Sequence, residues 1–435
     1  MADLSVAGRI YQGGRLVKGV LHIDTAAGVI EKVTKSQALK EHLDFGDKAV
    51  LPGAIDVHVH FRDPGAMHKE DFQTGTTAAA FGGVTSVVDM PNTLPPTTNP
   101  RTVQGKHEIA AKKAVVDYGF WAGATWYADG LPETLKGCVG VKAYLGATTG
   151  DLLLDDPTAL RKVFERAAEA GKPIALHAEA ERILKGLKRT EHAPADHDAA
   201  RPPLAEVEAV YDVMKLIAPL KRTPRIHVAH MASQEAVHAA EQARFSRGVC
   251  PHHLLLSTQD FADVPDPGFG KMNPPLRDER GRKALYSAFA AGRIQVLESD
   301  HAPHTRAEKE GQFQQAPAGV PGVETLMPVM LAEAAAGRLD LRTVVDAASS
   351  APAALLGLED RGALETGRRA DFAVYDLDDV GSVDPDRLHS KCGWSPFAGR
   401  DAVFPSQVFL AGRPVVEDGG LVAGPGTGRS LVPWP

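Results

Sequence analysis

The middle of the chain alternates between short apolar runs and alanine-rich stretches. The runs have the length and the flanking residues of buried strands, and the stretches at 159–170, 204–217 and 233–243 show helical character. Strands that alternate with helices are typical of a parallel sheet, and eight of them favour an α/β fold of the (β/α)₈ TIM-barrel type. The eight predicted strands are 54–59, 85–90, 114–121, 139–145, 173–177, 225–228, 248–251 and 295–297.

The two ends of the chain have a different pattern. Residues 1–51 contain short β-like runs broken by glycine and charged residues, and residues 359–435 have the same texture. Neither end holds enough apolar residues to form a core alone. We therefore expect both ends to pair into one small β-sandwich domain, beside a barrel domain of residues 52–358.

Composition limits the classes of protein to consider. The 435 residues are 43% hydrophobic and 24% charged, as in an ordinary globular protein. The formal charge of −7 without a basic block argues against nucleic acid or an anionic membrane as the main partner. Three cysteines without a C-x-x-C pair do not form a disulfide framework, and no signal or membrane segment is evident. We expect a cytoplasmic protein.

Ionisable side chains stand at the carboxyl ends of five predicted strands. His58 and His60 are two residues apart on the first strand, so their side chains share a face. Lys142 lies inside an apolar run, where an unpaired ammonium group is costly. In a barrel these strand ends meet on the face that carries catalysis. The full set is His58, His60, Lys142, His177, His230 and Asp300.

This set has the chemistry of a two-zinc site. A single strand-end histidine is more often structural than a ligand, but the coincidence of all these groups favours a functional site. Imidazoles and carboxylates bind Zn²⁺, and two zinc ions about 3.5–4 Å apart can share a hydroxide. Two dications need an anion between them. Lys142 becomes such an anion when it adds CO₂ to form a carbamate. Carbamylated Lys142 is therefore a candidate bridge between two zinc ions per chain.

Six motifs extend the set over most of the barrel. They are L-P-G-A-I-D-V-H-V-H-F-R-D-P-G (51–65), H-K-E-D-F (68–72), D-M-P-N-T (89–93), L-H-A-E (176–179), P-H-H-L (251–254) and S-D-H-A-P-H (299–304). Together they resemble the signature motifs of the dihydroorotases in the amidohydrolase superfamily. The resemblance covers about residues 50–355, in the same order.

The resemblance implies a role for each residue. It implies reversible hydrolysis of the cyclic amide of dihydroorotate to N-carbamoyl-aspartate, with Asp300 as general base and then general acid. The backbone near residues 318–321 would contact the substrate. The zinc ligands would be His58, His60 and Asp300 for the more buried ion, His177 and His230 for the second, and Lys142 for both. The substrate would be held by Arg62, Asn92 and His304 at its carboxylate and by Asn273 at its ring.

The identity of the metal bridge stays open at this level. Some bacterial relatives use an aspartate from the loop after the fourth strand, and this chain has Asp151, Asp155 and Asp156 there. The sequence V-K-A-Y-L around Lys142 resembles the lysine-using branch, so we favour Lys142. Thr148 and Thr149 belong to the same loop, which in relatives can fold over the substrate.

The other histidines call for simpler interpretations. We expect His107, His192, His197 and His238 to be solvated, with the stretch 191–203 a polar loop. His252 and His253 are expected to have structural or supporting roles rather than to bind metal.

Several alternatives to this function remain. Allantoinases and hydantoinases use the same type of metal site, but Arg62 and Asn92 favour a substrate with a free carboxylate. An inactive homologue that partners aspartate transcarbamoylase should have lost metal ligands, whereas every expected ligand type is present here. As partners we expect a small anionic substrate, a second copy of the chain in a homodimer and, less directly, aspartate transcarbamoylase.

Overall fold

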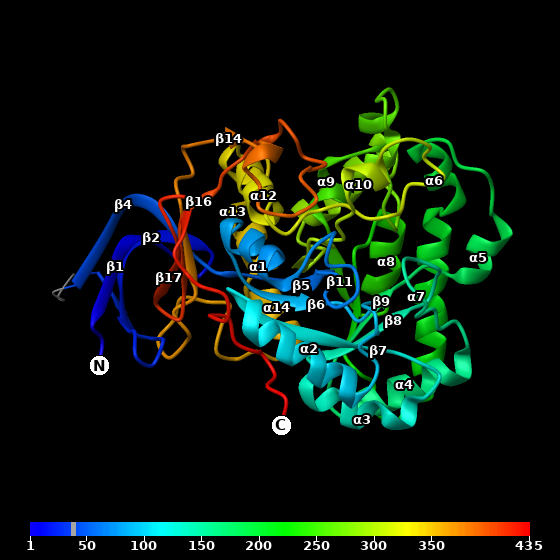
Figure 1. Cartoon of the computed structure of the whole chain (residues 1–435), viewed down its shortest axis with the longest axis horizontal. Coiled ribbons are helices and arrows are strands. Elements are labelled where there is room, and N and C mark those ends of the chain that lie inside the picture. The colour runs from blue at the N-terminus through cyan, green and yellow to red at the C-terminus, as the bar shows by residue number, and fades with distance from the viewer. Residues whose placement is uncertain (36–40) are drawn as a thin grey trace.

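The barrel forms the centre of the molecule in the computed structural model, which describes residues 1–35 and 41–435 (Figure 1). Its eight parallel strands follow each other around the sheet in sequence order. The ring is joined where the backbone NH of His60 donates to the carbonyl oxygen of His301 at 2.7 Å. The predicted TIM barrel is therefore confirmed. The strands are β5 (Ala54–Val59), β6 (Val84–Asp89), β7 (Asp117–Gly123), β8 (Gly140–Tyr144), β9 (Ile174–His177), β10 (Ile226–Val228), β11 (Ser246–Val249) and β12 (Val296–Leu297).

Helices cover the outside of the barrel, and side chains at their N-termini set where several of them begin. Asp71 caps α1 and Asp156 caps α4 by accepting hydrogen bonds from backbone NH groups of the first turn. The helices are α1 (Phe72–Phe81), α2 (Pro100–Lys113), α3 (Leu131–Thr134), α4 (Pro157–Glu169), α5 (Glu181–Gly186), α6 (Pro194–Ala200), α7 (Pro203–Ile217), α8 (Gln234–Gln242), α9 (Pro251–Leu255), α10 (Glu279–Ala290), α11 (Arg306–Lys309), α12 (Leu326–Ala335), α13 (Leu341–Ala348) and α14 (Ser350–Leu356). None of the helices in the described ranges is long and apolar enough to cross a membrane.

Both ends of the chain contribute to a second sheet beside the barrel, as expected (Figure 1). The strands from the two ends of the chain meet where β4 pairs with β13: Pro52 pairs with Phe372, and Val50 pairs with Val374. The strands of this sheet, in spatial order, are β18 (Gly420–Leu421), β17 (Arg413–Glu417), β16 (Pro405–Leu410), β13 (Phe372–Tyr375), β4 (Glu41–Pro52), β1 (Leu4–Gln12), β2 (Arg15–Asp24) and β3 (Val29–Thr34). A small apolar core of its own includes Val6, Ile10, Leu21, Phe372 and Phe409.

One predicted strand begins later than its apolar run. Residues 114–116 are as apolar as the strand that follows, but β7 starts only at Asp117. The carbonyl of Ala114 instead accepts hydrogen bonds from the NH groups of Gly426 and Gly428, near the C-terminus. The C-terminal segment therefore occupies the backbone groups that a longer strand would use.

The stretch 191–203 is not only a loop. It contains α6, which begins at Pro194 in the first helical position, where the missing NH of proline costs nothing. The prediction of a polar loop was wrong at this point. Because the helix turns one face inward, His197 becomes buried.

Candidate active site

Six predicted metal ligands converge at the carboxyl ends of the barrel strands. The Nε2 atoms of His58 and His60 lie 3.3 and 3.1 Å from Oδ1 of Asp300. On the neighbouring strands, Nδ1 of His177 lies 3.3 Å from Nε2 of His230. The rings of His58 and His230 are 4.9 Å apart between centroids, so the two groups adjoin. The arrangement forms two adjacent sets of ligands.

The His60 imidazole shows that this arrangement suits a cation. Its Nδ1–H donates to Oδ1 of Asn92 at 2.7 Å, so in the neutral ring the lone pair is on Nε2. Burial lowers the pKa of His60, which favours this neutral form. The Nε2 lone pair then faces the Asp300 carboxylate, and two acceptors 3.1 Å apart call for a positive ion between them.

Lys142 is the sixth group of the set. Its side chain is fully buried, and its Nζ has no hydrogen-bond partner among the described residues. Burial lowers its pKa to about 8, even though the nearby carboxylates of Glu298 and Asp300 act to raise it. A larger share of neutral amine results, and the neutral amine is the form that reacts with CO₂. The unpartnered nitrogen therefore suits the attachment of an additional group.

Two buried carboxylates orient the histidines from behind. Glu179 accepts a hydrogen bond from Nε2–H of His177 at 2.7 Å and is itself paired with Arg201. Glu298 lies 3.5 Å from Nδ1 of His58 and accepts a hydrogen bond from the backbone NH of His230. Carboxylates in this position fix the tautomer and the orientation of a metal-binding imidazole. Neither glutamate is among the residues predicted to bind metal or substrate, although Glu179 stands in the L-H-A-E motif.

Three predicted site residues have a left-handed backbone. The φ angles are 60° at Arg62, 39° at His230 and 45° at Asp300, a region that non-glycine residues rarely adopt. Each residue lies two or three positions after the end of a barrel strand. Such conformations cost of order 1–3 kcal/mol each and are concentrated at functional sites. The strand ends thus turn sharply and direct these side chains into one pocket.

A pocket lies over the two sets of ligands, and predicted substrate contacts line it. Asn92 and Asn273 lie on its wall, and Arg62 is buried there with an exposed fraction of 7%. No carboxylate of the described residues is within ion-pair distance of the Arg62 guanidinium. The lining residues are His58, His60, Arg62, Asn92, Tyr144, Thr148, Thr149, His177, His230, Asn273, Asp300, Ala302, Ala318 and Gly319.

His304 stands behind Arg62 and does not line the pocket itself. Its Nε2 lies 3.4 Å from Nη2 of Arg62 and 3.1 Å from the carbonyl oxygen of Ala318. The backbone carbonyl of His304 accepts from the indole NH of Trp394 at 2.7 Å. His304 therefore connects the Arg62 side chain to the loop at 318–319.

The loop after β8 spans the mouth of the pocket. The amide of Asn92 donates to the carbonyl of Thr149 at 3.0 Å, and the Thr149 hydroxyl lies 3.4 Å from the carbonyl of Ala318. On the other side, the Asn273 amide lies 3.4 Å from the Thr148 hydroxyl. These contacts connect opposite walls through one short loop, which is the arrangement expected of a closed lid.

The three alternative aspartates lie outside the pocket lining. Asp151 and Asp155 are exposed, with Asp155 3.5 Å from Lys185. Asp156 caps α4 through the NH of Ala159 at 2.7 Å. Of the four candidates for the metal bridge, Lys142 is the one that lies among the histidines.

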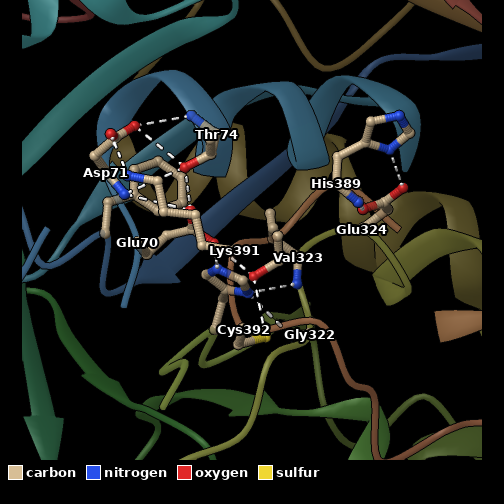
Figure 2. A network of polar contacts seen from close by, with 12 residues as sticks. Glu70, Asp71, Thr74, Gly322, Val323, Glu324, His389, Lys391 and Cys392 are labelled. Carbon is tan, nitrogen blue, oxygen red and sulfur yellow. Dashed lines mark hydrogen bonds and ion pairs between the residues drawn. The ribbon is translucent and has the colours of Figure 1, made fainter. Parts of the chain in front are cut away.

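A polar network surrounds Glu70, with Asp71, Gly322 and Lys391 among its members (Figure 2). The neighbouring His301 contacts Oε2 of Glu70 at 3.3 Å, and the Ser390 hydroxyl donates to the same oxygen at 2.5 Å. Nδ1 of His301 accepts from the NH of Gly322 at 3.1 Å. Glu70 comes from the H-K-E-D-F motif, so the network gives that motif a structural purpose. It links the residue after Asp300 to the segment that leads into β15 (Asp401–Ala402).

Two histidines that we expected to be solvated are buried. His107 lies on α2 and makes a 2.9 Å hydrogen bond with the carbonyl of Gly137. His197 lies on α6, where Nε2 is 2.8 Å from Oδ1 of Asn273 and Nδ1 is 2.7 Å from Glu191. The prediction was wrong for both, because a partner distant in sequence compensates each ring for the loss of water. His192 and His238 are exposed, as expected.

Comparison with known proteins agrees with this geometry. Residues 49–416 match the model of the Amidohydrolase family. A dihydroorotase of Halobacterium salinarum is 42% identical over 372 residues, which cover 85% of this chain and 86% of that protein. An allantoinase of Streptomyces avermitilis is 35% identical over 395 residues, with 86% of each chain covered. The L-hydantoinase (dihydropyrimidinase) structure from Arthrobacter aurescens has a TM-score of 0.93 at 26% identity, with 99% of each chain covered.

Proposed function

The chain belongs to the amidohydrolase family, and from this premise we propose that it is a dihydroorotase. It is a cyclic amide hydrolase, and its reaction is the reversible addition of water across the ring amide bond of dihydroorotate. The product of ring opening is N-carbamoyl-aspartate.

The buried Arg62 is the observation that carries this choice of substrate. Its guanidinium is in a pocket wall without a carboxylate partner from the described residues. A planar guanidinium pairs with a carboxylate through two parallel hydrogen bonds. Dihydroorotate brings such a carboxylate on its ring, whereas allantoin and simple hydantoins do not. Arg62 with Asn92 and the supporting His304 therefore selects the anionic substrate, and Asn273 contacts its ring.

The ligand sets suit two zinc ions. His58, His60 and Asp300, whose ligand atoms lie within 4.8 Å of one another, would hold one ion. His177 and His230 would hold the other, and Lys142 as a carbamate would supply the anion shared by both. Carbamate forms when the neutral Lys142 amine attacks CO₂, a C–N bond forms and the nitrogen loses a proton. When bound, the zinc ions polarise the ring carbonyl and lower the pKa of the attacking water.

Asp300 moves the proton. Its carboxylate takes a proton from the attacking water and delivers it to the ring nitrogen that leaves. Ring closure uses the same steps in the opposite order. The contacts of Thr148 and Thr149 across the pocket mouth keep bulk water out during these transfers.

A comparison of three substrates tests the proposal. Purified, zinc-loaded protein is assayed with dihydroorotate, allantoin and hydantoin in parallel. We expect the highest kcat/KM with dihydroorotate, in both directions of the reaction. Turnover of allantoin or hydantoin without turnover of dihydroorotate would assign the chain to a neighbouring activity. Absence of turnover with all three, despite full metal content, would favour the inactive structural homologue.

Replacing Arg62 with lysine should leave the protein folded but lower kcat/KM for dihydroorotate. The loss should correspond to on the order of 2–4 kcal/mol of transition-state stabilisation, because a lysine does not form the paired contact. Dihydrouracil has the same ring without the carboxylate, so its slow hydrolysis should change little in this variant. Steady-state kinetics with both compounds check the prediction. Equal losses on the two substrates would show that Arg62 does not bind the carboxylate.

We further propose that the enzyme acts in pyrimidine biosynthesis in the cytoplasm, forms a homodimer and associates with aspartate transcarbamoylase. The domains would be residues 1–51 with 359–435, and residues 52–358. Light scattering of the purified protein, alone and mixed with aspartate transcarbamoylase, measures both assemblies.

A further inference from the structure

A second cluster of metal-binding side chains lies at the end of β11. Cys250 follows this strand directly, and His252 and His253 lie on the short helix α9 that comes next. One ligand atom from each residue lies within 4.8 Å of the others. The three side chains are buried, with exposed fractions of 0%, 1% and 3%. None of them belongs to the ligand sets described above.

The histidines of this cluster have unused nitrogen atoms. Nε2 of His253 lies 3.0 Å from the carbonyl oxygen of Pro274, so this nitrogen carries the hydrogen and Nδ1 carries the lone pair. That Nδ1 is buried and has no partner among the described residues, and the same is true of Nε2 of His252. Burying a polar atom without a hydrogen-bond partner destabilises the folded protein. Two such atoms beside a thiol therefore require a compensating partner.

A metal ion satisfies all three atoms at once. The Nε2–H···O=C bond of His253 is the kind of outer contact that orients a metal-binding imidazole. One sulfur and two nitrogen ligands suit zinc, which binds thiolates at about 2.3 Å and imidazoles at about 2.0 Å.

We propose that Cys250, His252 and His253 form a third metal site, separate from the two catalytic ions, that binds zinc through one sulfur and two nitrogen ligands. Binding exchanges the thiol proton of Cys250 for the metal, and the proton is released to solvent. The ion connects the end of β11 to the segment at Pro274, next to the predicted substrate contact Asn273. It thereby fixes one wall of the substrate pocket.

The sulfur ligand allows a test that does not depend on catalysis. The two catalytic ions have only nitrogen and oxygen ligands, so cobalt bound there gives no thiolate-to-metal charge-transfer band. We expect the full-length protein saturated with Co²⁺ to show this near-ultraviolet band and a third equivalent of metal. With zinc, X-ray absorption should show one Zn–S distance of about 2.3 Å. A wild-type protein with two metal equivalents and no metal–sulfur contact would overturn the proposal, whatever its activity.

Substitutions assign the band to this site. Cys250→Ser should remove the band and the third equivalent while the other two remain. Cys138→Ser and Cys392→Ser are matched controls, since these buried cysteines lie elsewhere and should leave the band intact. His252→Gln and His253→Gln should each weaken binding of the third ion at least about tenfold. A band that persists at full strength in both histidine variants would place the cysteine on a catalytic ion instead and refute the site.

Discussion

Replacing Lys142 with alanine is expected to abolish turnover and to remove most of the bound metal. The variant lacks the group that we propose as the bridge between the two ligand sets, so two dications would face each other without an anion between them. A metal site supplies several kcal/mol of transition-state stabilisation, and we expect a loss on the order of 10³-fold or more in kcat. Activity and elemental analysis of the same preparation measure both effects.

Chemical rescue and matched aspartate variants distinguish the two bridge hypotheses. Short carboxylic acids should partly restore metal content and activity to Lys142→Ala, because they occupy the space of the carbamate. Asp151→Asn and Asp155→Asn should leave both unchanged, since these residues are exposed outside the pocket. Detection of an unmodified Lys142 side chain, with no CO₂ attached, in fully metallated and active wild-type protein would exclude the carbamate. The hydrolase function would survive that result with a different bridge.

The second large effect is expected for Asp300→Asn. Asparagine keeps the size of the side chain and one oxygen that can bind metal, but it cannot accept a proton. Loss of a general acid–base group lowers rates by typically 10²–10⁴-fold. We expect kcat to fall in that range while KM for dihydroorotate changes little, because Arg62 and Asn273 still bind the substrate. Steady-state kinetics and metal analysis together measure the loss.

Asp418→Asn is the matched control for this variant. Asp418 also has a left-handed backbone, with φ of 46°, but it lies in the turn between β17 and β18, outside the pocket lining. This control shows what an Asp-to-Asn change does to a left-handed backbone position outside the pocket. The control variant should retain full activity. If Asp300→Asn kept more than about a tenth of kcat, the proton would be moved by another group.

The barrel could be predicted because its strands are marked locally. Runs such as 54–59 and 139–145 are mostly apolar, as buried parallel strands require, and helices with alanine-rich faces separate them. Hence all eight strands were found, with small errors at their ends. The His58–His60 pair and Lys142 were equally visible, since a polar residue inside an apolar run contrasts with its neighbours.

What the sequence did not reveal depends on contacts across the fold. Glu298 is a single glutamate in a polar stretch, and its orientation toward His58 exists only after β5 and β12 close the ring. His197 looked like a solvated loop histidine because its partner, Asn273, lies 76 residues away. The left-handed backbone at His230 and Asp300 likewise has no local signal, since neither residue is glycine. Long-range closure creates these features.

The pairing of β4 with β13 also constrains how the chain is made. Roughly 320 residues separate Pro52 from Phe372, and a ribosome adds about 5–20 residues each second. For about 15–60 s, the nascent N-terminal strands therefore wait beside a growing barrel with one edge of β4 unpaired. An unpaired edge is a template for pairing with other chains. We therefore expect that covering this edge of β4 during synthesis raises the yield of correctly folded protein.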